Sequence, residues 1–116
     1  MEELDIPIFK KVYELYKLFY SYRNNISKQD RYTLWQKIET LVLEIIESIL
    51  LASSVPKSDR LTILEKISLN LNKLRIFVRL AKEVRILDNQ KYLVLQENID
   101  EIGRQLGGWI KSTKTV

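Results

Sequence analysis

Basic side chains are concentrated in one quarter of this 116-residue chain, between positions 55 and 85. Eight lysines and arginines stand there against three acidic residues, which leaves +5 on this segment in a chain whose total charge is +4. Such side chains bind phosphate through charge-assisted hydrogen bonds, and the planar arginine fork does so bidentately. One basic segment on an otherwise balanced chain predicts a surface that meets an anion, with phosphate as the natural target. The basic residues are Lys57, Arg60, Lys66, Lys73, Arg75, Arg79, Lys82 and Arg85.

The residue types that enzymes use most are missing or isolated. The chain has no His and no Cys, which excludes His-based acid–base chemistry, the Glu-x-x-His di-iron motif, thiolate metal sites and disulfides. Glu44 and Glu47 are three residues apart, but they project away from the apolar stripe of their helix and are interpreted as a solvated face. The glycines follow no strand, so they form no phosphate-binding loop. We therefore expect no catalytic residue, no metal and no cofactor.

Helices must position the basic residues. Leu, Ile, Lys and Glu dominate the composition, and Gly and Pro are rare, which predicts an all-α chain. Apolar residues recur at alternating spacings of three and four, as in packed helices. The predicted helices cover residues 7–23, 28–53, 58–86 and 89–111, and their short connections favour an antiparallel up-down-up-down four-helix bundle. We expect residues 1–116 to form a single domain.

The ends of these helices carry recognisable signals. Ser27, Ser58 and Asp88 are the predicted N-caps, and residues 111–116 are interpreted as a frayed, mildly basic tail. The first five residues are acidic, unlike the basic start of a signal peptide, and no uncharged apolar stretch approaches eighteen residues. These features predict a soluble, cytoplasmic protein that does not span a membrane. Because the apolar stripes are needed for the core, no amphipathic helix is left free to rest on a membrane.

The apolar stripe of residues 58–86 is committed to the core, so the cations must lie on its two shoulders. Arg75, Arg79 and Lys82 share one shoulder, and Lys66 and Lys73 share the other. Next to them, Arg85 stands near the helix C-terminus, where a cation suits the helix dipole. The alternative is an ordinary solvated face whose long stems cover apolar surface. Six cations and one anion between positions 66 and 85 favour anion binding instead.

Two further features suggest close packing between helices. Residues 7–23 carry a double stripe of aromatic and aliphatic side chains, wider than a core-facing stripe needs, which favours a subunit interface over stacking of nucleobases. Gly103 and Gly107 share a helix face, which predicts close approach of a neighbouring helix. The alternative is a helix C-cap at Gly107 or Gly108.

Two motifs carry a family resemblance. Residues 74–81 read LR-x-x-x-RLA, and residues 101–109 read EIGR-x-LGGW. Together they resemble small bacterial four-helix-bundle proteins, a family that includes the accessory variability determinant (Avd) proteins of diversity-generating retroelements and the proteins encoded in ribosomal RNA intervening sequences. The resemblance covers nearly the whole chain.

The resemblance implies a homopentameric barrel with a basic surface and no catalytic residues. It also implies that the protein binds a reverse transcriptase together with template RNA or an RNA/DNA hybrid, in support of mutagenic cDNA synthesis during retrohoming. Arg75, Arg79 and Arg104 match the motifs and are candidate nucleic-acid-binding residues. The further candidates, implicated by charge alone, are Lys66, Lys73, Lys82 and Arg85.

An alternative comes from the intervening-sequence branch of the same family. In that case the chain is a structural or protein-interaction bundle without a nucleic-acid role, and the basic helix faces an acidic protein partner. A reverse transcriptase gene and a template/variable repeat pair beside this gene would favour the Avd branch.

Overall fold

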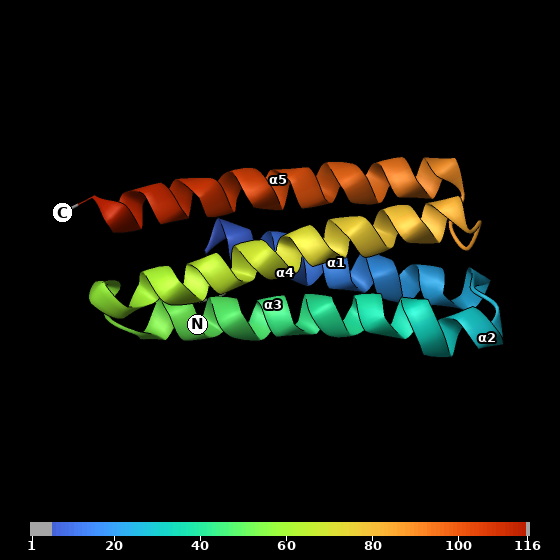
Figure 1. Ribbon diagram of the computed structural model, residues 1–116, viewed down its shortest axis with the longest axis horizontal. Coiled ribbons are helices and arrows are strands. Elements are labelled where there is room, and N and C mark those ends of the chain that lie inside the picture. The colour runs from blue at the N-terminus through green and yellow to red at the C-terminus, as the bar shows by residue number, and fades with distance from the viewer. Residues whose placement is uncertain (1–5, 116) are drawn as a thin grey trace.

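Four long helices build residues 6–115, the part of the chain that the computed structural model describes (Figure 1). The acidic N-terminal residues, on which the signal-peptide prediction rests, and Val116 lie outside these described residues. The long helices are α1 (Pro7–Tyr22), α3 (Gln36–Ser54), α4 (Lys57–Glu83) and α5 (Asn89–Lys114). Between α1 and α3 lie the 3-10 turn η2 (Arg23–Asn25), the short helix α2 (Lys28–Asp30) and the π-helical turn η3 (Arg31–Trp35).

Successive long helices run in alternating directions along the 48 Å axis of the molecule (Figure 1). Both α1 and α4 pack against α3 and α5, so the four helices surround one core. This arrangement agrees with the predicted antiparallel bundle. Among the described residues, no helix combines the length and the hydropathy that crossing a bilayer requires.

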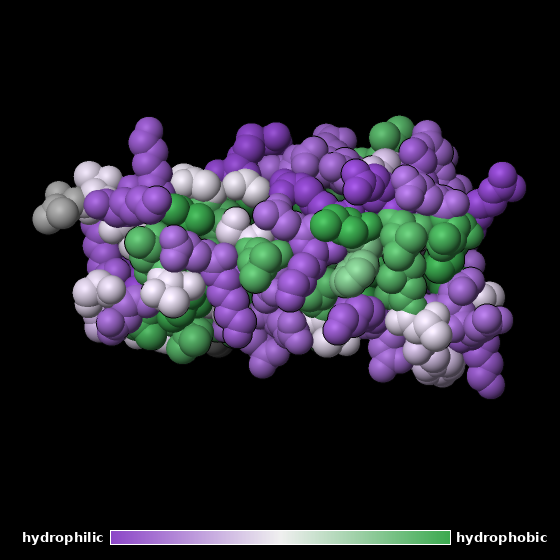
Figure 2. Space-filling view, in the orientation of Figure 1, coloured by the Kyte–Doolittle hydropathy of each residue, from purple (hydrophilic) through white to green (hydrophobic). Residues whose placement is uncertain are grey.

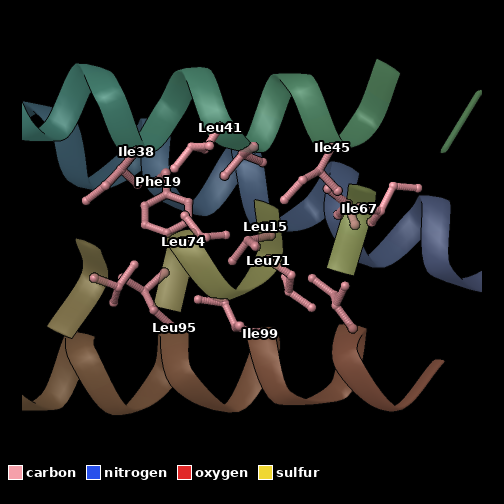
Figure 3. Packing of buried hydrophobic residues seen from close by; sticks show 14 of the residues in the cluster. Leu15, Phe19, Ile38, Leu41, Ile45, Ile67, Leu71, Leu74, Leu95 and Ile99 are labelled. Atoms are coloured by element: carbon pink, nitrogen blue, oxygen red, sulfur yellow. The ribbon is translucent and has the colours of Figure 1, made fainter. Parts of the chain in front are cut away.

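The core consists of the apolar stripes that the spacing predicts. Side chains from all four long helices converge between the ribbons, with Phe19, Ile45, Leu74 and Leu95 as examples (Figure 3). Every member of the stripes on α3 and α4 is buried. Trp35 is fully buried, donates an indole hydrogen bond to the Phe19 carbonyl oxygen at 3.3 Å and meets the Phe19 ring edge to face. Aliphatic burial of this kind is the main term that stabilises the bundle.

Two of the three predicted N-caps are confirmed. The Ser27 hydroxyl accepts a hydrogen bond from the Asp30 amide, and the Asp88 carboxylate accepts one from the Lys91 amide at 2.8 Å. This amide and the Lys91 ammonium hold the pKa of Asp88 below its usual value of 3.8. The cap therefore contributes stability above that value and loses it as the pH falls through the lowered pKa. Ser58 is not a cap, because the helix begins at Lys57 with Pro56 at the N-cap position.

The end of α4 differs from the sequence-based prediction. The helix ends at Glu83, and Arg85 follows in the left-handed region at φ 67° instead of closing the helix. The amide of Arg85 donates to the Lys82 carbonyl oxygen, and the amide of Ile86 donates to that of Ala81, which is the Schellman hydrogen-bond pattern. Gly usually occupies this position because it adopts positive φ without a steric cost. An arginine there gives no sequence signal for the end of the helix.

The end of α5 also differs from the prediction. The helix continues through Gly107 and Gly108 to Lys114, so neither glycine is a C-cap, and most of the predicted frayed tail is helical. Each glycine costs a helix about 1 kcal/mol relative to alanine. Burial of Ile102 and Leu106 on the inner face of the same segment offsets this cost.

Candidate nucleic-acid interface

The outward side of α4 carries exposed cations. Lys66, Lys73 and Arg79 are exposed, and their side chains make no hydrogen bond or ion pair with any residue between positions 6 and 115. The helix lies in front in Figure 1, and Figure 2 shows hydrophilic side chains along this face of the molecule. We call Lys66, Lys73 and Arg79 the basic face. Unpaired cations on both shoulders of one helix attract a polyanion.

Two of the eight basic residues of the segment have local structural roles instead. Arg60 donates hydrogen bonds to the carbonyl oxygens of Ala52 at 2.8 Å and Val55 at 3.1 Å, and its guanidinium lies over the Trp109 ring. It therefore satisfies carbonyl groups that the end of α3 leaves free. Lys57 donates to the Thr115 carbonyl oxygen at 2.7 Å and joins the start of α4 to the end of α5.

Arg75 is held between α4 and α5. Its guanidinium donates to the Asn72 side chain at 3.1 Å and pairs with Asp100 at 3.4 Å, and its side chain is 32% exposed. The guanidinium also lies directly over Gly103, where a Cβ atom would stand 2.7 Å from Nη2. The arginine of one sequence motif therefore packs on the glycine of the other. Any phosphate that binds Arg75 competes with Asp100, so Arg75 is weaker as a candidate contact than the basic face.

The glycine prediction is corrected by the same contact. A side chain, not the backbone of a neighbouring helix, approaches Gly103. Around Gly107 and Gly108, no atom of another helix among the described residues lies within 4 Å of the position that a Cβ would occupy. The prediction that a neighbouring helix comes close at these glycines is therefore wrong within one chain.

Arg104 lies on the exposed side of α5. Its guanidinium donates to Glu101 Oε1 at 2.6 Å and 2.9 Å, and together with a hydrogen bond from Gln105 it lowers the pKa of Glu101. Arg104 and Arg75 line one groove of about 400 Å³ between α4 and α5. Each of the two arginines already has a carboxylate partner, which reduces the positive potential of this groove.

The last two candidates stand near the end of α4. The Lys82 ammonium lies 4.7 Å from the centre of the Tyr92 ring, and Arg85 is exposed after the helix. Lys82 and Arg85 line the same pocket, and Arg75 and Arg79 share a neighbouring one. As predicted, Arg75, Arg79 and Lys82 lie on one shoulder of α4, the shoulder that faces α5.

Aliphatic side chains on the outward side of α4 are a feature that the sequence interpretation missed. Leu69, Ile76 and Val84 are more than half exposed, and Leu80 is exposed to a lesser extent. Figure 2 shows a continuous hydrophobic area on this face, toward the end of the molecule where α4 ends and α5 begins. The signal was present in the spacing, because Leu69 and Ile76 are seven residues apart and lie opposite the core stripe. An exposed patch of this kind typically marks a contact with another macromolecule.

A second apolar surface lies over α1 and α3. Tyr13, Tyr20 and Leu43 are exposed large side chains on these two helices. The rings of Phe9 and Tyr13 stack with centroids 5.8 Å apart, and Arg23 lies over the Tyr20 ring. The wide apolar circumference predicted for the first helix is therefore present at the surface. Glu44 and Glu47 are exposed on α3, as expected for a solvated face.

Fold and surface together define a small helical bundle that presents unpaired cations and exposed aliphatic side chains. Among residues 6–115, no group of three or more acidic side chains is placed to hold a metal ion. A protein-family model described as bAvd-like matches residues 7–113, nearly the whole chain. The chain belongs to the bAvd-like family, an Avd-type family of accessory rather than catalytic proteins. No curated protein gives a significant match.

Proposed function

We propose that this protein is a non-enzymatic, nucleic-acid-binding accessory protein of a diversity-generating retroelement. It binds template RNA and a reverse transcriptase and supports mutagenic cDNA synthesis. The observation that carries the proposal is the basic face of Lys66, Lys73 and Arg79, which has no acidic partner among the described residues of a chain from an Avd-type family. Lys82 and Arg85 add two exposed cations near the end of α4.

The salt dependence of RNA binding tests the proposal. Phosphate contacts release counterions, so the logarithm of the association constant should fall linearly with the logarithm of the salt concentration, by about 0.7 per phosphate for a single strand. We expect a slope of at least about −2 from the three cations of the basic face, measured by fluorescence anisotropy with a labelled oligoribonucleotide. A flat response, or no binding at about 0.05 M salt, would contradict the proposal.

We further propose that the protein assembles as a homopentamer through the apolar surface of α1 and α3. The exposed Tyr13, Tyr20 and Leu43 supply a hydrophobic contact that a monomer leaves in water. A ring also multiplies the basic face, so weak phosphate contacts add up along one RNA molecule.

Light scattering on the purified protein measures this assembly. We expect the mass of five chains for the wild type and a smaller mass for Leu43→Arg, because an arginine there places a charge in the proposed contact. Val94→Arg is the matched control, since Val94 has nearly the same exposure, 40% against 42%, and lies on α5. A monomeric wild type, or equal masses for the two variants, would reject the contact.

The second candidate function is a protein-interaction bundle without a nucleic-acid role. Leu69, Ile76 and Leu80 favour it, because exposed aliphatic groups between cations suit an acidic, amphipathic protein surface better than a phosphate backbone. The reverse transcriptase itself can supply such a surface, so both contacts can coexist on α4. RNA binding by the isolated protein discriminates between the two functions, since only the first requires it.

A further inference from the structure

A basic pocket lies at the end of the bundle where α1 and α4 end and α5 begins. Its volume is about 520 Å³, within the range of small-molecule binding sites. Three cations contribute to its lining, namely Lys82 at the end of α4, Arg85 in the turn and Lys91 in the first turn of α5. Tyr22 from α1 completes one wall. Elements from three parts of the sequence therefore place three positive charges around one concavity.

The protein neutralises only one of the three positive charges of this pocket. Asp88 is the one acidic residue in the lining, and it is engaged by the amide of Lys91 and, at 3.2 Å, by its ammonium group. Lys82 contacts the face of an aromatic ring, and the Arg85 guanidinium has no hydrogen-bond acceptor among residues 6–115. The lining carries a net charge of about +2. Because Asp88 already caps α5, an anion would bind to the side-chain cations and not to the helix end.

Arg85 holds its place in this pocket at a conformational cost. A non-glycine residue at positive φ costs of order 1 kcal/mol or more, and glycine would avoid the cost in this Schellman turn. A glycine would satisfy the backbone of this turn, whereas Arg85 also contributes a charged side chain to the pocket. A strained position that keeps a charged side chain beside other cations suggests a ligand-binding role.

We infer that the pocket formed by Tyr22, Lys82, Arg85 and Lys91 binds a phosphomonoester. A phosphomonoester carries close to two negative charges near neutral pH, which matches the net charge of the lining, whereas an internal phosphodiester carries one. Arginine and lysine supply the charge-assisted donors that such a group accepts. The volume leaves room for the attached nucleoside beside the Tyr22 ring. The phosphomonoester belongs either to the end of an RNA chain, in which case the inference rests on the proposed function, or to a free nucleotide.

Two oligoribonucleotides of one sequence test this inference, one with a 5′-phosphate and one with a 5′-hydroxyl. We expect the phosphorylated strand to bind about tenfold more tightly, the effect of one strong charged contact, in an anisotropy assay. Adenosine monophosphate is added as a competitor. Removal of the tenfold preference by it identifies a pocket open to free nucleotides, and persistence of the preference identifies a site for RNA ends. Equal binding of both strands, with no heat of binding for the nucleotide in calorimetry, overturns the inference.

Arg85→Gly is the decisive variant because it removes the guanidinium and relieves the strained φ. We expect its thermal midpoint to rise by a few degrees while the preference for the 5′-phosphate is lost. Lys10→Gln, which removes an exposed cation of α1, is the control and should retain the preference. A preserved preference in Arg85→Gly, or an equal loss in Lys10→Gln, rejects the pocket.

The same measurements separate this inference from the proposed function. Binding of the 5′-hydroxyl strand reports on RNA binding without a terminal phosphate, which is the proposed function. If neither strand binds but the nucleotide does, RNA binding fails and the pocket stands. If both strands bind equally and the nucleotide does not, RNA binding stands and the pocket fails.

Discussion

Replacing Lys66, Lys73 and Arg79 together with glutamate is expected to weaken RNA binding by at least ~100-fold at about 0.1 M salt. Each lost phosphate contact forfeits the release of about 0.7 counterion, which at this salt concentration is worth about a factor of five. Three contacts therefore account for about 100-fold, and repulsion by the new carboxylates adds to the loss. Fluorescence anisotropy with a labelled oligoribonucleotide measures the change.

These three positions are chosen because the fold does not use them. Their side chains are exposed and have no partner among the described residues, so circular dichroism should show an unchanged helical content. Arg75→Glu would be a poor test, since a glutamate there faces Asp100 and lies over Gly103. Loss of binding in that variant would report damage to the α4–α5 contact as much as loss of a phosphate contact.

A control variant with the same change in charge separates a local contact from a general effect of net charge. Lys10, Lys28 and Lys37 are exposed on α1, α2 and α3, and their replacement by glutamate changes the total charge by the same amount. We expect a loss of less than ~10-fold for this variant, because distant charges are screened within about 10 Å. Equal losses in both triple variants would show that RNA does not bind preferentially to α4.

The spacing of apolar residues was sufficient to predict the four long helices, the core and the bundle, but not the π-helical turn before α3 or the ends of α4 and α5. Burial of a continuous apolar stripe is the largest favourable contribution to the free energy of folding. It outweighs the weak helix propensities of single residues. The three glycines of α5 illustrate this, because Ile102 and Leu106 keep the helix in register where local propensity predicts its end. The missed end of α4 has the opposite cause. The hydrogen bonds of the Schellman turn end that helix, and an arginine at position 85 is not a sequence signal for such a turn.

The sequence indicated which side chains are basic but not which of them are free. Arg60 satisfies the end of α3, and Arg75 reaches an aspartate 25 positions further along the chain. Contacts of this kind depend on how far one helix is shifted along its axis relative to the next. The spacing of apolar residues does not determine that shift. The structure thereby narrows the candidate interface to cations without an acidic partner. It also shows a pocket that Tyr22 and Lys91, which lie in other helices, help to line.

Arg23→Ala is expected to destabilise the protein by about 3 kcal/mol and to lower its thermal midpoint by about 10 °C. Glu39 is only 3% exposed, and both of its carboxylate oxygens accept hydrogen bonds from the Arg23 guanidinium. Removal of the arginine leaves a buried charge without a partner, which typically costs 3–5 kcal/mol. The expected value lies at the lower end of that range because Arg23 is 36% exposed, so water can partly replace it. Urea or thermal unfolding followed by circular dichroism measures the change.

Two further variants identify the buried charge as the cause. Arg23→Met combined with Glu39→Met removes both charges and should recover most of the lost stability, since an apolar pair of similar volume often replaces a buried ion pair without loss. Lys17→Ala breaks the exposed pair between Lys17 and Glu14 and should change the free energy of unfolding by less than ~0.5 kcal/mol. If Arg23→Ala were no more destabilised than Lys17→Ala, or if the double variant were as unstable as the single one, this ion pair would not be what fixes the end of α1 against α3. Because the Arg23 guanidinium also covers the Tyr20 ring, its loss should disturb the proposed subunit contact on α1 and α3 as well.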